Sequence, residues 1–272
     1  MSARSLLTEQ NAKTVKGEAL GFLTGILYFA PHKRSGKNVC PYATPGCIDA
    51  CLYTAGRGVF DSVQAARLRK TESFFRDRDA FILQLHSDVA RFAGRATRKG
   101  MKPVVRLNGT SDLRWELLAP SLFASFPDVQ FYDYTKDSER FNAWMYRARI
   151  AGSVMTPAGL RYPQIEWPRN YHLTFSASER TTPGDIRYLL ANGGTVTLVT
   201  TAGAKTPLKA LAPFFPESLP YWKYPAVDGD AHDLRFLDAP GSLVLLRPKG
   251  RARKDTTGFV WRPGMVMMGG SV

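Results

Sequence analysis

The sequence predicts an α/β protein with a mostly parallel sheet, arranged as a complete or partial (β/α) barrel. Short apolar runs recur along the 272 residues, and most are separated by segments long enough to form a helix. Some runs, such as TVTLV at 195–199, are almost continuously apolar, as expected for parallel strands buried on both faces. All three cysteines lie in one loop after the first of these runs. We therefore expect a single domain over residues 1–272, with its site at the carboxyl ends of the strands.

The elements can be placed in order along the chain. The first predicted strand lies within GFLTGILYFAP, residues 21–31, and leads into the cysteine loop. A long helical region follows, from residue 61 to about residue 99, because apolar residues recur there at helical spacing. Asp77 or Asp79 is available to cap a helix within it. The later predicted strands span residues 102–112, 128–137, 171–179, 194–201, 224–238 and 241–250.

Polar side chains stand at the ends of these predicted strands. In a (β/α) barrel the strand ends meet at one mouth, so we expect these side chains to converge there. The candidates for binding a substrate or cofactor are Asn108, Asp112, Lys136, Ser176, Ser178, Glu179, Arg247 and Lys249. The candidates for orienting a substrate or moving protons are Asp228, Asp230, His232 and Asp233. Taken singly, each could instead close a turn or cap a helix.

The three cysteines, Cys40, Cys47 and Cys51, have the spacing C-x6-C-x3-C. Cys47 and Cys51 are four residues apart, so on a helical turn their sulfurs face the same side. Three thiolates can hold a [4Fe–4S] cluster and leave one iron open for another ligand. The alternatives are a zinc ion completed by His32 or a carboxylate, and three plain buried thiols. A lone nucleophilic cysteine, which would leave the clustering unexplained, has these candidate bases: His86, His172 and His232.

Positive charge dominates the composition, with 37 Lys and Arg against 23 Asp and Glu and a formal net charge of +14. This excess favours a polyanionic partner, most simply nucleic acid or a nucleotide, although an acidic small substrate would also account for it. No apolar run is long enough to span a bilayer, and the N-terminus lacks the apolar core of a signal peptide. We therefore expect no membrane partner and a cytoplasmic location, where clustered thiols are typical of metal binding or catalysis.

Two segments resemble the gene product 88 family, whose members are carried by bacteriophages, plasmids and related mobile elements. They are CPYATPGCIDACLYTAGRG, residues 40–58, and DGDAHDLRFLDAPGSLVLLRPKGRARKD, residues 228–255. The resemblance covers most of the chain. It implies a phage or plasmid origin, and for a phage protein a place in the host cytoplasm, but it brings no established activity.

More distantly, the chain is similar to radical S-adenosylmethionine enzymes, which place three cluster cysteines after the first strand of a partial (β/α) barrel. Cys40, Cys47 and Cys51 occupy that place, although that superfamily usually has the spacing C-x3-C-x2-C. The segment NGTSD, residues 108–112, stands where an acidic glycine-rich motif normally holds the methionine end of the cofactor. This similarity implies a [4Fe–4S] cluster, S-adenosylmethionine as a second cofactor, and an external electron donor.

Three functions fit these observations, and the sequence leaves the substrate and the oligomeric state open. The first is an iron–sulfur enzyme with radical chemistry on nucleic acid or a nucleotide. The second is a non-enzymatic nucleic-acid-binding protein with a structural or redox-sensing cluster, in which the basic segment RPKGRARK, residues 247–254, contacts phosphates. The third is a zinc-stabilised adaptor for a host protein. Iron and acid-labile sulfide in the purified protein would separate the first two from the third.

Overall fold

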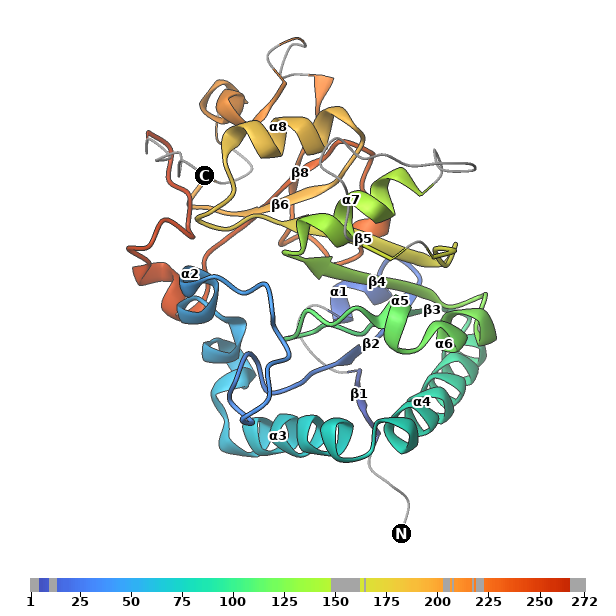
Figure 1. Ribbon diagram of the computed structural model, residues 1–272. Helices are drawn as coiled ribbons and strands as arrows, with labels where there is room; N and C mark the ends of the chain where they lie inside the picture. Colours follow the sequence, from blue (N-terminus) through green and yellow to red (C-terminus); the bar gives the residue numbers. More distant parts are fainter. Residues whose placement is uncertain are drawn as a thin grey trace.

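A computed structural model describes residues 5–9, 14–147, 162–163, 165–202, 206, 208–216, 218 and 223–264. Its centre is one eight-stranded sheet in the order β1-β2-β3-β4-β5-β6-β8-β7 (Figure 1). Neighbouring strands are parallel except β1 and β2, which are antiparallel. The strands are β1 (Leu7–Thr8), β2 (Phe22–Leu27), β3 (Lys102–Arg106), β4 (Gln130–Thr135), β5 (Tyr171–Ser176), β6 (Val196–Val199), β7 (Ala226–Asp228) and β8 (Leu243–Leu246).

The predicted α/β class with a mostly parallel sheet is confirmed, but the sheet is open. Strands β1 and β7 form its two edges and do not pair with each other in the described chain, so a complete barrel is not formed. Strand β8 also lies between β6 and β7, so the last two strands are not in chain order. The sequence gives no sign of β1, because two residues are too few to show an alternating pattern.

The predicted helical region at 61–99 forms two helices, α3 (Asp61–Arg76) and α4 (Arg78–Arg98). The break falls at Asp77, whose side chain accepts a hydrogen bond from the Ala80 N–H at 3.0 Å and so caps α4, as the sequence suggested. The other helices are α1 (Thr14–Glu18), α2 (Pro45–Asp49), α5 (Trp115–Leu118), α6 (Pro120–Ser125), α7 (Ser138–Tyr146) and α8 (Pro183–Ala191), with the 3-10 turns η1 (Leu52–Thr54), η2 (Gly56–Val59), η3 (Leu208–Phe214), η5 (Arg235–Leu237) and η6 (Gly250–Lys254). None of the helices that the structure describes is both long and apolar enough to cross a membrane.

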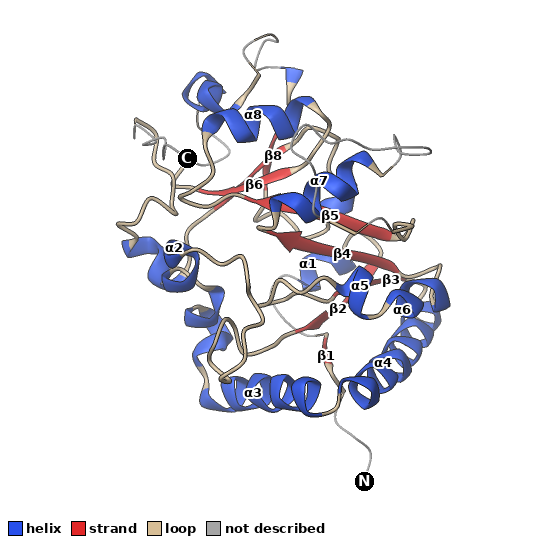
Figure 2. Cartoon of the chain, in the orientation of Figure 1, coloured by secondary structure: helices blue, strands red, loops and turns tan. Residues whose placement is uncertain are grey.

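Alternation along the strands sends side chains to two different cores. Val105 and its equivalents on other strands enter the large core beneath helices α4, α7 and α8. Val104 and Tyr132 point to the opposite face, where they pack with Leu234 from the segment after β7. The arrow of β4 points toward the side of the molecule where α2 lies, so the cysteine segment is at the carboxyl ends of the strands (Figure 2).

Candidate functional site

A cavity of about 200 Å³ lies at the carboxyl ends of the strands, beneath the cysteine loop. We call it the cysteine cavity, because Cys40, Cys47 and Cys51 all line it. The structure also brings these other predicted site residues to its wall: Asn108, Asp112, Lys136, Ser176, Arg247 and Lys249. Residues far apart in sequence therefore meet at one mouth, as expected for the ends of parallel strands.

Glu179 holds the start of the cysteine helix α2 in place. One carboxylate oxygen accepts from the Thr44 hydroxyl at 2.7 Å, and the other accepts from the Gly46 N–H at 2.8 Å. Thr44 in turn caps α2 by accepting from the Cys47 N–H at 3.3 Å. A Cβ at Gly46 would lie 2.8 Å from both Glu179 and Phe259, so glycine is needed for this close approach. Glu179 was predicted to bind a substrate or cofactor, and the structure places it as an anchor of the cysteine loop.

Two backbone groups form hydrogen bonds with the sulfur of Cys40. The His32 N–H donates to Cys40 Sγ at 3.3 Å, and Cys40 Sγ donates to the Thr110 carbonyl at 3.5 Å. His32 has a φ of 52°, a left-handed conformation that no other non-glycine residue of the described chain adopts. Such strain persists where the surrounding structure requires it, often at functional sites. His32, the candidate fourth zinc ligand, thus meets Cys40 through its backbone.

Burial raises the pKa of all three thiols, and that of Cys40 to about 12. The thiols are close enough that a charge on Cys47 or Cys51 would raise the Cys40 pKa further. They are therefore neutral at neutral pH, and a metal that displaced their protons would turn them into thiolates. Over the described residues, no three His, Cys, Asp or Glu side chains converge closely enough to hold a metal ion.

A buried arginine whose charge acts on the pKa of Cys51 forms no ion pair within the described residues. Arg67 on α3 is only 9% exposed, and its Nε and Nη1 have no hydrogen-bond partner in the part of the chain that the structure describes. Its guanidinium carbon lies 4.8 Å from the centre of the Tyr28 ring. The acidic groups that act on it are Tyr28, Cys51 and Tyr53, which are uncharged when protonated. Because a buried charge without a counter-charge is costly, an anionic metal–thiolate group at Cys51 fits this environment.

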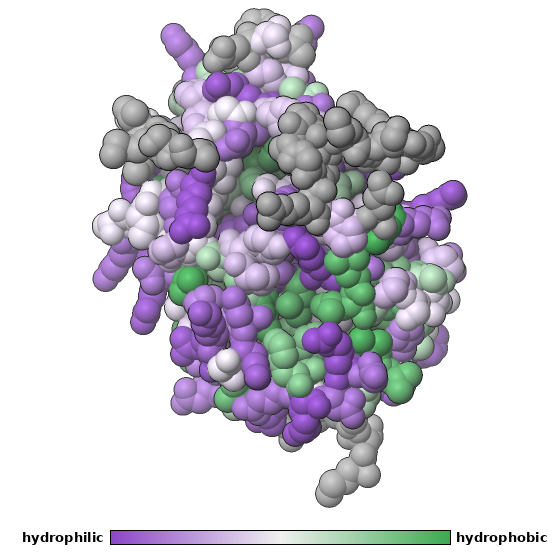
Figure 3. All heavy atoms as spheres, in the orientation of Figure 1, coloured by the Kyte–Doolittle hydropathy of each residue, from purple (hydrophilic) through white to green (hydrophobic). Residues whose placement is uncertain are grey.

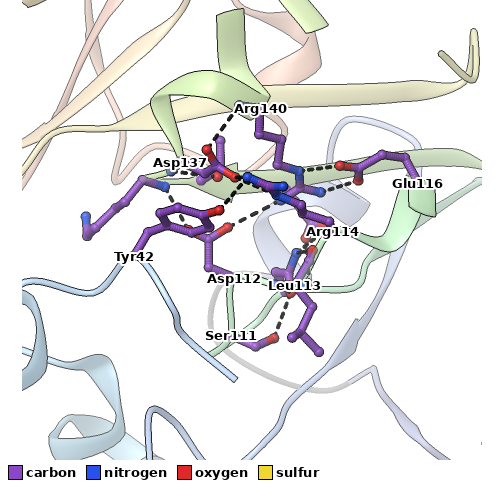
Figure 4. Close-up of polar contacts among 12 residues, drawn as sticks. Tyr42, Ser111, Asp112, Leu113, Arg114, Glu116, Asp137 and Arg140 are labelled. Carbon is purple, nitrogen blue, oxygen red and sulfur yellow. Dashed lines mark hydrogen bonds and ion pairs between the residues drawn. The ribbon is translucent and has the colours of Figure 1, made fainter. Parts of the chain in front are cut away.

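A buried ionic network supports the wall of the cavity at Asp112 (Figure 4). The Asp112 carboxylate accepts from the Lys136 N–H at 2.8 Å and from Arg140 Nη1 at 3.3 Å. Arg140 is fully buried and also donates to both carboxylate oxygens of Glu116, at 2.8 and 2.6 Å. Arg114 extends this network to the cysteine loop, because it pairs with Asp137 and contacts the hydroxyl of Tyr42. The network fixes the loop against α7.

The side-chain amide of Asn108 forms all of its hydrogen bonds within the protein. Its Nδ2 donates to the Leu113 carbonyl and to Asp133, and its Oδ1 accepts from the Ser111 hydroxyl and the Leu113 N–H. These bonds use the whole hydrogen-bonding capacity of the amide. Asn108 was predicted to bind a substrate or cofactor, and the structure shows it shaping the 108–112 loop.

The four residues predicted as catalytic do not line the cysteine cavity. Asp233 lies buried on the opposite face of the sheet from the large core, where it accepts from Arg106 at 2.9 Å and from the hydroxyls of Tyr132 and Tyr134 at 3.0 and 2.8 Å. Asp228 ends strand β7, and Asp230 and His232 lie in the segment that follows it: Asp228 accepts from the Asp230 N–H, Asp230 pairs with Lys249, and His232 contacts Arg235. Of these three, Asp230 supports the cavity rim from outside, through Lys249 and the Arg247 N–H.

A family model described as gene product 88 matches residues 5–263. The chain belongs to the gene product 88 family. Searches of curated proteins and of solved structures gave no match, so the similarity to radical S-adenosylmethionine enzymes gains no support from them. Membership of the gene product 88 family suggests a phage protein, as the cysteine loop and the 228–255 segment indicated. The family brings no activity, so the function has to be argued from the site.

Sequence reasoning missed two residues of this gene product 88 site, Arg106 and Arg67, whereas Tyr134 follows a predicted strand and was expected at the mouth. Arg106 and Tyr134 line the cysteine cavity and connect it to Asp233. A signal for Arg106 was present, since a charged residue inside the apolar run KPVVRL is unusual for a buried strand. Arg67 had no such signal, because it is one of many arginines on a helical segment and only the fold shows that it is buried.

Proposed function

We propose that this gene product 88 protein is an iron–sulfur protein in which Cys40, Cys47 and Cys51 hold a [4Fe–4S] cluster with one iron open to the cysteine cavity. The proposal rests on one observation above all: the three thiols line one cavity at the carboxyl ends of parallel strands. Arg67 supports it, because its Nε and Nη1 have no partner in the described chain and its charge acts on the pKa of Cys51. Three thiolates on a cluster would supply the missing negative charge.

The arrangement favours a cluster over the two alternatives. Zinc holds its sulfur ligands about 2.3 Å from one point, so three sulfurs must converge tightly around it. The described residues contain no such convergent set, whereas the three thiols share the wall of a cavity that has room for a larger group. Three plain buried thiols would leave the buried charge of Arg67 without an explanation.

We further propose that the protein is an enzyme whose open sheet acts as a partial barrel of the radical S-adenosylmethionine kind. The bound cluster would supply one-electron chemistry, with S-adenosylmethionine as its partner and an external electron donor. The chain's own part would be to hold the loop and orient the ligand. The Arg247 side chain lines the cavity and forms no ion pair within the described chain, so it would meet an anionic substrate such as a nucleotide.

A second candidate, a nucleic-acid-binding protein with a structural or redox-sensing cluster, is favoured by the charge beside the cavity. The exposed side chains of Arg251, Arg253 and Lys254 stand on η6, which contacts η1 of the cysteine segment. Hydrophilic side chains project from this side of the molecule in the space-filling view, where Figure 1 places α2 and η6 (Figure 3). Phosphates of a single strand could bind there while a base enters the cavity.

Metal analysis of anaerobically purified protein tests the cluster. We expect about four irons and matching acid-labile sulfide per chain. Cys40→Ala, Cys47→Ala and Cys51→Ala should each lose most of the iron, whereas Ser35→Ala, on the same loop but outside the cavity wall, should keep it. Zinc without sulfide, or iron that survives all three substitutions, would contradict the proposal.

A second measurement separates the enzyme from the binding protein. The reduced, cluster-loaded protein should cleave S-adenosylmethionine to 5′-deoxyadenosine under anaerobic conditions, and the Cys47→Ala protein should not. A fully loaded cluster that leaves S-adenosylmethionine intact would overturn the radical version and favour the binding protein.

A further inference from the structure

A second cavity, of about 440 Å³, lies beside the cysteine cavity at the carboxyl ends of β4 and β5. We call it the α7–α8 cavity, because the first turns of these two helices line it. Ala43, Lys136 and Ser176 line both cavities and so form the partition between them. Its volume falls in the range of roughly 300–1,000 Å³ found for ligand pockets, and the carboxyl ends of parallel strands are where open sheets bind ligands.

The lining of the α7–α8 cavity has an excess of positive charge. Lys136 Nζ donates to the hydroxyl and carbonyl of Ser176 and to the carbonyl of Ala177, all of them uncharged oxygens. Arg180 is exposed, and its guanidinium has no ion pair within the described chain. Asp185 is the acid of the lining, but its carboxylate is engaged in the capping box of α8, where it accepts from the Thr182 N–H and hydroxyl at 2.8 and 2.7 Å. This balance favours an anionic ligand.

One residue of this lining carries an unsatisfied acceptor. Asn142 on α7 lines the cavity, and its Oδ1 atom is buried and has no hydrogen-bond partner among the described residues. A buried acceptor left unpaired destabilises the fold, so a donor from a bound molecule would relieve that cost. Hydroxyl groups complete the polar wall, from Ser138, Ser176, Ser178 and Thr181.

We propose that the α7–α8 cavity binds a phosphorylated small molecule of nucleotide size. Its phosphate would lie against Lys136 and Arg180, and one of its hydroxyl or amino groups would donate to Asn142 Oδ1. Phosphate matches two cations and several hydroxyl donors better than a carboxylate does, because it has three acceptor oxygens and up to two charges. Ser178, which the sequence marked as a binding residue, lies in this cavity and not in the cysteine cavity. The lining contains no cysteine, although residues 41–44 of the cysteine loop belong to it, so the ligand would bind beside the cluster residues without contacting them.

Binding to metal-free protein tests this site, so a failure of the cluster proposal would leave the result unchanged. Isothermal calorimetry would use adenosine 5′-monophosphate, ribose 5-phosphate, inorganic phosphate and adenosine as probes, with the Cys47→Ala protein as a cluster-free reference. We expect the phosphate esters to bind at least tenfold more tightly than adenosine. Arg180→Gln should weaken them about tenfold, and Lys136→Gln should do the same.

A matched control and a second variant keep the test decisive. Arg169→Gln removes the same charge from an exposed arginine before β5, at the opposite end of the strand, and should leave binding unchanged. Asn142→Leu should weaken the phosphate esters several-fold while leaving inorganic phosphate unaffected. Adenosine binding as tightly as its monophosphate, or equal effects of Arg180→Gln and Arg169→Gln, would overturn the phosphate site. Inorganic phosphate alone binding, with no effect of Asn142→Leu, would overturn the larger ligand.

Discussion

The guanidinium Nε and Nη1 of Arg67 are buried and have no hydrogen-bond partner within the described chain, and Cys51 is an acidic group acting on Arg67 that a metal would deprotonate. In the cluster-loaded protein, Arg67→Met should therefore make the reduction potential more negative, because the lost positive charge no longer stabilises the more negative reduced state. A redox titration followed by electron paramagnetic resonance measures this. Arg69→Met, on the same helix but exposed, should leave the potential nearly unchanged.

The same variant has a different expected effect without metal. Metal-free Arg67→Met should be at least as stable to denaturant as the metal-free wild type, because the substitution removes a buried charge for which the described residues supply no counter-ion. A large loss of stability in the metal-free variant would show that Arg67 has a partner inside the protein, and this interpretation of its role would then be wrong.

His172 gives the folded state a sensitivity to acid. Burial, with Arg147 and Arg235 nearby, lowers its pKa from 6.5 to about 3, and its Nε2 has no hydrogen-bond partner among the residues that the structure describes. Below pH 6.5 the unfolded chain takes up a proton that the folded chain refuses, so stability falls as the pH falls toward 3. Between pH 7 and 5.5 this amounts to about 1 kcal/mol in the free energy of unfolding. Denaturant titrations at both pH values should show that His172→Gln removes that part of the decrease; an identical decrease in the variant would contradict the assignment.

At the scale of elements, the five-residue helix α2 depends on a contact from another part of the fold. Glu179, which follows β5, makes two hydrogen bonds to the start of α2, and a helix this short has little stability of its own. Glu179→Ala should lower the free energy of unfolding by about 2–3 kcal/mol. It should also speed the reaction of the metal-free cysteines with a thiol reagent, because the loop loses its anchor. Glu166→Ala, which removes an exposed carboxylate, should change neither quantity.

The sequence predicted the elements whose buried residues leave a local pattern of apolar residues along the chain. The apolar runs at β2 to β6 and at β8, the α3–α4 region and the cap at Asp77 are visible because they depend on neighbouring residues. The position of β8 between β6 and β7 cannot be seen in the sequence, because strand order is decided by pairing between distant segments.

The residues of the candidate site also divide into those that the sequence could place and those that it could not. The cysteines and Lys136 follow strands and could be placed, whereas Asn108 and Glu179 look like ligand-binding residues until their internal hydrogen bonds are known.

At the scale of the whole molecule, the net charge of +14 can act either as a diffuse field or through one face. If η6 beside the cysteine cavity is the binding face, its three exposed cations should account for the salt dependence of affinity. For a single-stranded oligonucleotide, each lost phosphate contact lowers the slope of log affinity against log salt by about 0.7. The triple variant Arg251→Gln, Arg253→Gln and Lys254→Gln should therefore reduce the slope by about 2.

The control for this prediction removes the same charge from another face. Arg69, Arg76 and Arg98 are exposed on α3 and α4, away from η6 in Figure 1, and changing all three to glutamine should leave the slope nearly intact. Fluorescence anisotropy at several salt concentrations measures both variants against the wild type. Equal losses in the two variants would mean that the charge acts as a diffuse field, and the nucleic-acid face at η6 would be wrong. A selective loss at η6 would place the phosphates at the rim of the cavity that the cysteines line, where a polymer substrate of the proposed enzyme would have to bind.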